Sequence, residues 1–239
     1  MTPSPVGAAA PPHRRLFAPE RIGWWIGVLF MVGSACFALA SLPGFASRAN
    51  ALTVGTTYFV GSVFFTSAAL LQHLQTIHAK GPSGALRRME TWATAVQLVG
   101  TVFFNITTGA ALNDTLDTQQ QIARVWAPDA IGSVCFLVAS YLAILVVRRD
   151  RHPGDEADRR IAWFNMIGSV FFGISALTSY ILPDTGEILD AEATNAFTFL
   201  GAVCFLLGAR ILAAQTLAAT PRRGSSDRDD ERRPRGALH

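Results

Sequence analysis

Six apolar stretches run through this chain, each about 20 residues long, which is the length of helix that crosses the hydrocarbon core of a bilayer. Charged residues gather in the two tails and in the connections between these stretches. A helix buried in a soluble protein rarely stays apolar on every side for so long. The pattern therefore predicts an all-α integral membrane protein with six spans, at residues 22–43, 52–74, 91–112, 126–147, 161–182 and 194–215.

The same short phrase recurs in every stretch: Gly, a small residue, any residue, Cys or Phe, and then Phe. Alternate copies are 67 to 71 residues apart, so the repeating unit is a helical hairpin that occurs three times. The predicted hairpins are 22–74, 91–147 and 161–215, and we expect the tails at 1–21 and 216–239 to be disordered. The phrase begins at Gly33, Gly61, Gly100, Gly132, Gly168 and Gly201.

Small residues follow each repeat glycine at helical spacing. With the glycine counted as 0, positions 0, +1, +4, +7 and +8 fall on one stripe of a helix, and all except the Phe at +4 are small. Small residues let helix backbones approach closely in lipid. We therefore expect the repeat glycines to pack helix against helix, with the Phe of one helix filling the groove of a neighbour.

Three residues before five of the six glycines, on the same stripe, the chain turns polar, and only Phe30 departs from this rule. Polar groups are costly in hydrocarbon unless they face the bundle interior or water, so these side chains either line a polar path or form hydrogen bonds between helices. Helices alternate in direction, which predicts two of them in the inner half of the membrane and three nearer the outer face. The inner pair is Gln97 and Asn165, and the outer set is Tyr58, Asp129 and Thr198.

Asp129 is the sharpest single candidate among these residues. It follows Pro128 in what is predicted to be the first turn of a helix, where a carboxylate can accept from free backbone N–H groups. This capping role is the favoured interpretation, and a proton or cation site is the alternative.

The net charge of +3 at pH 7 conceals an asymmetry. With the N-terminus placed inside, every Lys and Arg except Arg48 and Arg124 falls on the inner side. The connection before the last span contains acidic residues and no basic residue. This is the positive-inside pattern, so both termini are predicted to be cytoplasmic. The basic residues do not gather as nucleic-acid binding would require, so we expect no nucleic-acid partner.

Motifs that perform chemistry are missing from the sequence: we find no phosphate-binding glycine loop, no His-Glu metal motif and no nucleophile–base pair. Cys36, Cys135 and Cys204 share repeat position +3. A three-thiolate metal site is conceivable there, but the other copies have Phe at this position, which indicates packing instead. We therefore expect no catalytic residues, no cofactor and no metal.

The phrase Gly-Ser-x-x-Phe after a bulky apolar lead, as in residues 25–37, resembles the YrhK-like membrane proteins, which are small bacterial proteins built on a helical hairpin. The resemblance covers residues 22–215 as three tandem hairpins, although Gly100-Thr101 and Gly201-Ala202 depart from Gly-Ser. It implies a hairpin fold in a bacterial inner membrane, and it implies no activity and no catalytic residues.

The sequence favours a non-enzymatic multi-pass protein of the cell membrane with a structural or partner-binding role, because its most strongly patterned residues are those that pack helices. The expected partners are the lipid bilayer and either a second copy of the chain or another membrane protein. The alternative is a channel or transporter for a small solute or ion that uses the polar residues three positions before the glycines.

Overall fold

The computed structural model describes residues 21–79, 84–149 and 155–218. Within these ranges the chain is helical and forms no strand, apart from a single bridge between Ile181 and Ile188. Three short helical segments, α2 (Pro43–Ala46), α5 (Thr118–Gln121) and the π-helix η1 (Ile122–Trp126), lie between the long ones. The long helices of the described residues are α1 (Ile22–Ser41), α3 (Ala51–His78), α4 (Ala85–Ala110), α6 (Ala127–Arg149), α7 (Asp155–Thr178) and α8 (Ala191–Ala218).

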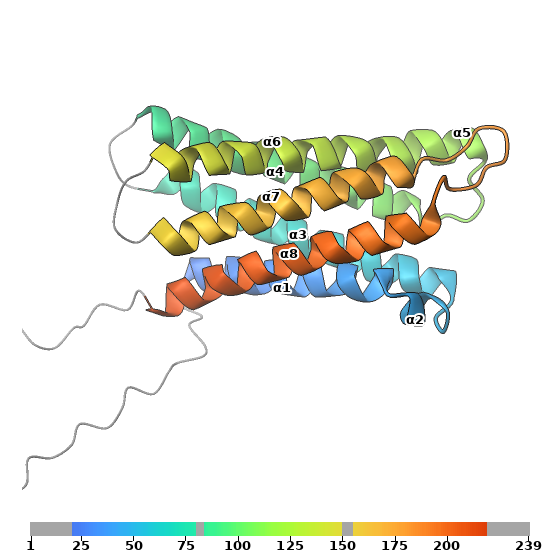
Figure 1. Cartoon of the computed structure of the whole chain (residues 1–239), viewed down its shortest axis with the longest axis horizontal. Coiled ribbons are helices and arrows are strands. Elements are labelled where there is room, and N and C mark those ends of the chain that lie inside the picture. The colour runs from blue at the N-terminus through green and yellow to red at the C-terminus, as the bar shows by residue number, and fades with distance from the viewer. Residues whose placement is uncertain (1–20, 80–83, 150–154, 219–239) are drawn as a thin grey trace, which may run out of the picture.

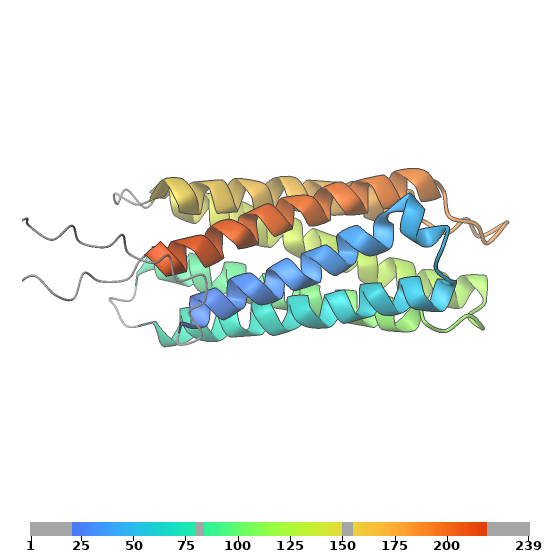
Figure 2. The same ribbon diagram turned by 90° about the horizontal axis from the view of Figure 1, so that it is seen from below.

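These long helices form a closed ring in chain order (Figures 1 and 2). Each packs against the helix before it and the helix after it, and α8 packs against α1. The guanidinium of Arg21 donates to the backbone carbonyl of Thr216, which joins the start of α1 to the end of α8. We call this the inner end of the bundle, and the opposite end, where α2 and α5 lie, the outer end.

The stripe that the repeat defines faces the centre of the ring. In each long helix the residues at positions 0, +1, +4, +7 and +8 are buried, from Gly33, Ser34 and Phe37 in α1 to Gly208 and Ala209 in α8. Large apolar side chains cover the outside instead: Val63, Val102 and Val134 are each more than 40% exposed. An apolar exterior around a bundle of this kind is suited to contact with lipid chains.

Five helical segments of the described residues are long and apolar enough to cross a membrane. They are Ile22–Ser41, Ala51–His78, Thr118–Arg149, Glu156–Thr178 and Ala191–Ala218. The remaining predicted span, 91–112, corresponds to α4, which is less apolar because it contains Gln97, Asn105 and several threonines. Asn105 faces a neighbouring helix, where its Nδ2 donates to Thr66 Oγ1 at 2.7 Å.

The observed elements differ from the predicted ones mainly at their ends. The last helix continues to Ala218, so the C-terminal tail does not begin at 216, and the rest of both predicted tails lies outside the described residues. The fourth predicted span, 126–147, is preceded by continuous helical backbone from Thr118 through η1. That π-helix lies directly before Pro128, which has no N–H with which to continue a regular α-helical ladder.

Candidate functional site

The repeat glycines meet in pairs within the three predicted hairpins: Gly33 with Gly61, Gly100 with Gly132, and Gly168 with Gly201. A Cβ atom placed on Gly201 would lie 2.4 Å from Phe172 Cδ1 and 3.0 Å from the carbonyl oxygen of Gly168. Real Cβ atoms do not approach other atoms this closely, so only glycine fits here without movement. The glycines thus allow each Phe at +4 to lie across the backbone of the partner helix.

The six Phe residues at +4 form one cluster at the centre of the ring, which we call the Phe layer. Phe37, Phe104 and Phe172 form one triangle, with ring centroids 5.8 to 6.3 Å apart. Phe65, Phe136 and Phe205 form a second triangle, with centroids 5.5 to 6.3 Å apart. The triangles touch through one pair in each hairpin, at 5.1 to 5.5 Å. The layer therefore fills the interior between the two ends of the bundle.

A cavity of about 530 Å³ occupies the interior at the inner end. Its wall comes from the last turns of α3, α6 and α8 and the first turns of α4 and α7. The wall is half polar and half apolar, with Thr76, Thr94 and Ser140 among its hydroxyl groups. We call this space the outer compartment of the inner cavity, because it lies farther from the Phe layer than the smaller space that adjoins it. It belongs to the inner end of the bundle and is unrelated to the outer end.

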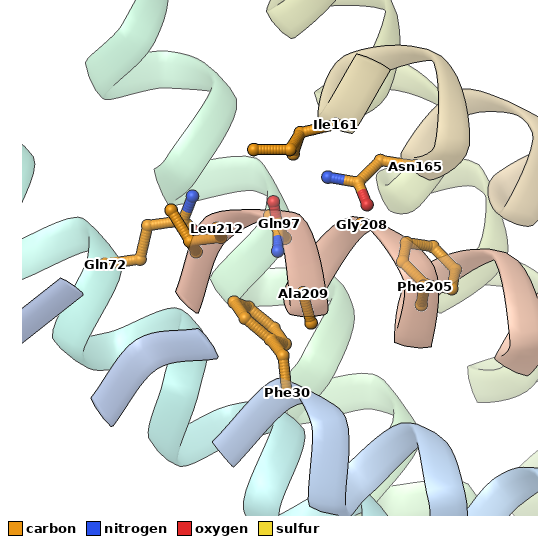
Figure 3. A pocket seen from close by; sticks show the side chains of 9 residues that line it. All are labelled: Phe30, Gln72, Gln97, Ile161, Asn165, Phe205, Gly208, Ala209 and Leu212. Atoms are coloured by element: carbon orange, nitrogen blue, oxygen red, sulfur yellow. The ribbon is translucent and has the colours of Figure 1, made fainter. Parts of the chain in front are cut away.

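A smaller space of about 30 Å³ continues from that cavity toward the Phe layer. The two spaces share Gln72, Gln97, Asn165, Ile161 and Leu212. Such a volume has room for about two water molecules. The rings of Phe30 and Phe205 close it on the side of the Phe layer, and the amides of Gln97 and Asn165 point into it (Figure 3).

The amide side chains of the cavity form no hydrogen bond with other described residues. This holds for Gln72, Gln97 and Asn165, which come from α3, α4 and α7. Gln72 Oε1 is fully buried and has no hydrogen-bond partner. A Cβ atom placed on Gly208 would lie 2.9 Å from Asn165 Oδ1. The absence of a side chain at Gly208 therefore leaves room for the amide of Asn165. Unpaired amides are costly away from water, so this cavity is suited to hold water or a polar ligand.

Both charged residues that line the cavity in the described part of the chain are acidic: Glu90 on α4 and Asp158 on α7. Asp158 Oδ1 accepts from Gln215 Nε2 at 2.9 Å. Glu90 precedes Gln97 by seven residues, and Asp158 precedes Asn165 by the same interval. The second and third hairpins therefore each supply one carboxylate near the mouth and one amide two turns deeper.

At the outer end, the polar residues of the repeat lie among other side chains and line neither of these two spaces. Thr198 Oγ1 and Ser175 Oγ share a hydrogen bond of 2.7 Å between α7 and α8. Tyr58 packs edge-on against Phe37, with centroids 5.4 Å apart, and lies close to Ser41 and Asp129. These side chains therefore lie in contacts between helices.

Asp129 does not cap a helix as the sequence suggested. Helical backbone already begins at Thr118, and the cap there is Asp117, whose Oδ1 accepts from Gln120 N at 2.8 Å. Because η1 joins α5 to α6 without a break, Asp129 lies well inside a continuous helical segment. The capping interpretation is therefore wrong, and Pro128 does not mark a helix start.

The five polar candidates of the sequence thus separate into two groups. The structure brings Gln97 and Asn165 together in the inner cavity, and it places Tyr58, Asp129 and Thr198 beyond the Phe layer. The sequence interpretation missed Gln72, Glu90 and Asp158. Helical spacing could have found Gln72, since it lies 11 residues after Gly61, as Leu212 does after Gly201, and both face the cavity.

The three cysteines are free and half-buried in separate helices. Cys36 packs beside Gly61, and Cys135 beside Gly100. No group of three or more His, Cys, Asp or Glu side chains in the described residues could hold a metal ion.

Comparisons with protein-family models, with curated proteins and with solved structures give no significant match. The functional argument for this chain therefore rests on its own residues.

Proposed function

We propose that this chain is a non-enzymatic six-span protein of a bacterial inner membrane, related to the YrhK-like proteins and built from three hairpins with both termini in the cytoplasm. The sixth span is α4. Its polar residues Gln97 and Asn105 face the bundle, and its outward residues Trp92, Val99 and Ile106 are apolar and exposed. A helix of this kind can cross lipid because its polar side chains face the interior of the bundle and its apolar side chains face the lipid.

The cytoplasmic placement of the inner end is supported by its charge. Arg87, Arg88, Arg148 and Arg149 lie there, whereas the connection that follows α7 contains Asp184, Glu187 and Asp190. Basic residues near span ends favour the cytoplasmic side. Reporter fusions test this topology: a fusion within residues 183–190 gives a periplasmic signal and one after residue 218 gives a cytoplasmic signal. The reverse pattern overturns it.

Within this frame, the protein takes up a small polar solute in the inner cavity, as a transporter or channel would. One observation supports this proposal: three amides from three different helices face one cavity and form no hydrogen bond with other described residues. Packing alone gives no reason to hold unpaired amides there, because each costs stability. The Phe layer separates the cavity from the outer end, so passage requires the layer to move.

A flux measurement tests the proposal. Purified protein is reconstituted in proteoliposomes, and swelling is followed by light scattering after mixing with each member of a panel of small neutral and charged solutes. We expect a solute-specific rate that falls with Asn165→Leu and is unchanged with Thr198→Val. Equal rates in liposomes with and without protein, for every solute, overturn the transport function.

A structural or partner-binding role is the second candidate, and the Phe layer favours it. The interior is closed by six packed rings, and the exterior offers large exposed apolar side chains to lipid or to another helical protein. Light scattering coupled to size exclusion in mild detergent tests it. A stable dimer or a larger assembly supports this role, and a monomer without a captured membrane partner argues against it.

A further inference from the structure

The geometry points to a binding site in the inner cavity for a small organic cation with N–H donors, of the alkylammonium or guanidinium type. Gln97 and Asn165 receive the donors, while Glu90 and Asp158 supply the charge that attracts it. This inference rests on the proposed solute-binding function and adds the charge and the hydrogen-bonding character of the solute.

The charge of the cavity sets the sign of the ligand. Glu90 and Asp158 line the outer compartment, and none of its lining residues in the described part is Lys, Arg or His. A cleft lined by one sign of charge between low-dielectric walls concentrates ions of the opposite sign. Two arginines of the inner end make other contacts: the Arg149 guanidinium contacts Met89 Sδ at 2.9 Å, and that of Arg148 lies 5.9 Å from the centre of the Trp163 ring.

The hydrogen-bonding groups match a donor-rich ligand. Each amide has a carbonyl oxygen as well as an NH2 group, and Gln72 Oε1 is a buried acceptor with no donor among the described residues. The carboxylates on the two hairpins are acceptors only, so the cavity as a whole offers more acceptors than donors. An ammonium group has three N–H donors and a guanidinium has several in a plane, and neither has an acceptor.

Aromatic rings close the small compartment, and this favours a cation over a neutral molecule. Phe30 and Phe205 line it opposite the amides. Cations are attracted to the faces of aromatic rings within about 6 Å, most strongly where water is excluded. With a volume of about 30 Å³, this compartment accepts only the charged head of a ligand, and the outer compartment of about 530 Å³ accommodates the rest.

The assignment of a cation site does not depend on a single residue, because the repeat supplies the same kind of residue pair twice. The pair Glu90 and Gln97 of the second hairpin recurs as Asp158 and Asn165 in the third, at the same spacing. In the first hairpin Gly23 and Phe30 stand at those positions, so its contribution is an aromatic ring instead of an amide. The cavity therefore combines two carboxylate–amide pairs with one aromatic surface.

Equilibrium dialysis of the full chain in lipid nanodiscs tests the proposal, with radiolabelled guanidinium as the probe. Urea has the same planar shape without the charge, and acetate has the opposite charge. We expect saturable guanidinium binding that is competed by methylammonium and not by urea or acetate. Asn165→Leu, which keeps the size of the side chain, weakens binding by about tenfold or more, because it removes one buried acceptor.

Two further variants separate the carboxylates from general effects on the fold. Glu90→Gln combined with Asp158→Asn weakens guanidinium binding by about threefold or more and removes most of its salt dependence, since salt screens the attraction that these charges exert. Thr198→Val, beyond the Phe layer, leaves the affinity unchanged. Each variant is accepted only if it elutes as a single species and its thermal midpoint lies within about 4 °C of that of the unaltered chain.

The outcomes distinguish this inference from the function on which it rests. Asn165-dependent binding of urea or acetate that equals or exceeds that of guanidinium overturns the cation assignment and leaves solute binding intact. Guanidinium binding that is unaffected by Asn165→Leu and by neutralisation of the carboxylates overturns the assignment of the site. No saturable binding of any probe overturns the cation site, while the flux measurement decides separately on transport.

Discussion

At the inner end of the bundle, the amides of Gln72, Gln97 and Asn165 face a cavity and have no hydrogen-bond partner among the described residues. At the outer end, Thr198 is hydrogen-bonded to Ser175, and Tyr58 packs against Phe37. The same repeat position supplies residues to both ends, since Gln97, Asn165, Tyr58 and Thr198 all precede a repeat glycine by three residues. The direction of the helix decides which end receives each residue. One sequence position therefore serves packing at one end and leaves polar groups open to a ligand at the other.

This difference indicates where function resides in a molecule whose sequence is dominated by packing. Polar groups that bond across helices stabilise the bundle modestly, whereas unpaired ones reduce its stability. Residues that reduce stability are typical of binding sites. Mutations at the two ends should therefore change different properties, and the Phe layer between them should control stability most strongly.

The largest loss of stability is expected from Phe136→Ala, because Phe136 is 1% exposed and its ring contacts Phe65, Phe104 and Phe205. Truncating a buried Phe costs about 3–5 kcal/mol of unfolding free energy. The thermal unfolding midpoint in detergent measures the loss. Phe103→Ala is the control, since Phe103 is the adjacent residue of the same phrase but only half-buried. Equal unfolding midpoints for the two variants would contradict the idea that the Phe layer controls the stability of the bundle.

A smaller loss is expected from Gly168→Leu, which tests the glycine contact between α7 and α8. A Cβ on Gly168 would lie 3.0 Å from the Phe205 ring and 3.1 Å from the Gly201 carbonyl oxygen, so a larger side chain must push the helices apart. Overpacking of a tight interior costs about 1–3 kcal/mol. Chemical unfolding compares it with Arg159→Ala, an exposed residue whose change should stay within about 0.5 kcal/mol. Equal stability of the two variants would show that this face does not pack.

The sequence predicted the helical architecture well, because span length, apolar composition and small-residue spacing are local signals. Its weak point was the segment before Trp126. Pro128 suggested a helix start, but α5 and η1 extend the helix back to Thr118, since a π-turn accommodates the missing N–H of proline. No sequence rule for helix starts includes this case.

The candidate site was only half visible in the sequence. The repeat identified Gln97 and Asn165, but it could not show that they share a cavity while Thr198 does not, because this depends on how the Phe rings fill the centre. Glu90 and Asp158 lie 10 residues before a repeat glycine, five helical turns before position +8 and therefore on the same stripe, but two turns away from the polar position that the repeat makes conspicuous. The sequence could not show that α4 and α7, which are not neighbours in the ring, border the same space and so bring both carboxylates to one cavity wall.

A modest loss is expected from Thr198→Val, which removes the hydrogen bond of 2.7 Å to Ser175 at the outer end. Interhelical hydrogen bonds of this type contribute about 0.6 kcal/mol on average. Thr57→Val is the matched control, because Thr57 is half-buried and its hydroxyl donates to the Thr53 carbonyl of its own helix, at 2.8 Å. A double mutant with Ser175→Ala measures the coupling: if the two single losses simply add, the pair does not stabilise the bundle.

The smallest change in stability is expected from Gln97→Met, although this residue faces the interior of the bundle. Met keeps the length of Gln and removes an amide that has no partner among the described residues, so no protein hydrogen bond is lost. The cost of an unpaired amide also disappears, and the unfolding free energy should stay within about 0.5 kcal/mol of the unaltered chain or rise above it. Thermal unfolding of Gln97→Met and of Thr198→Val, measured under the same conditions, compares the inner and outer ends of the bundle directly. A loss from Gln97→Met larger than that from Thr198→Val would mean that the inner amide is held by a bond that stabilises the fold, and the contrast between a ligand-accepting inner end and a packed outer end would then fail.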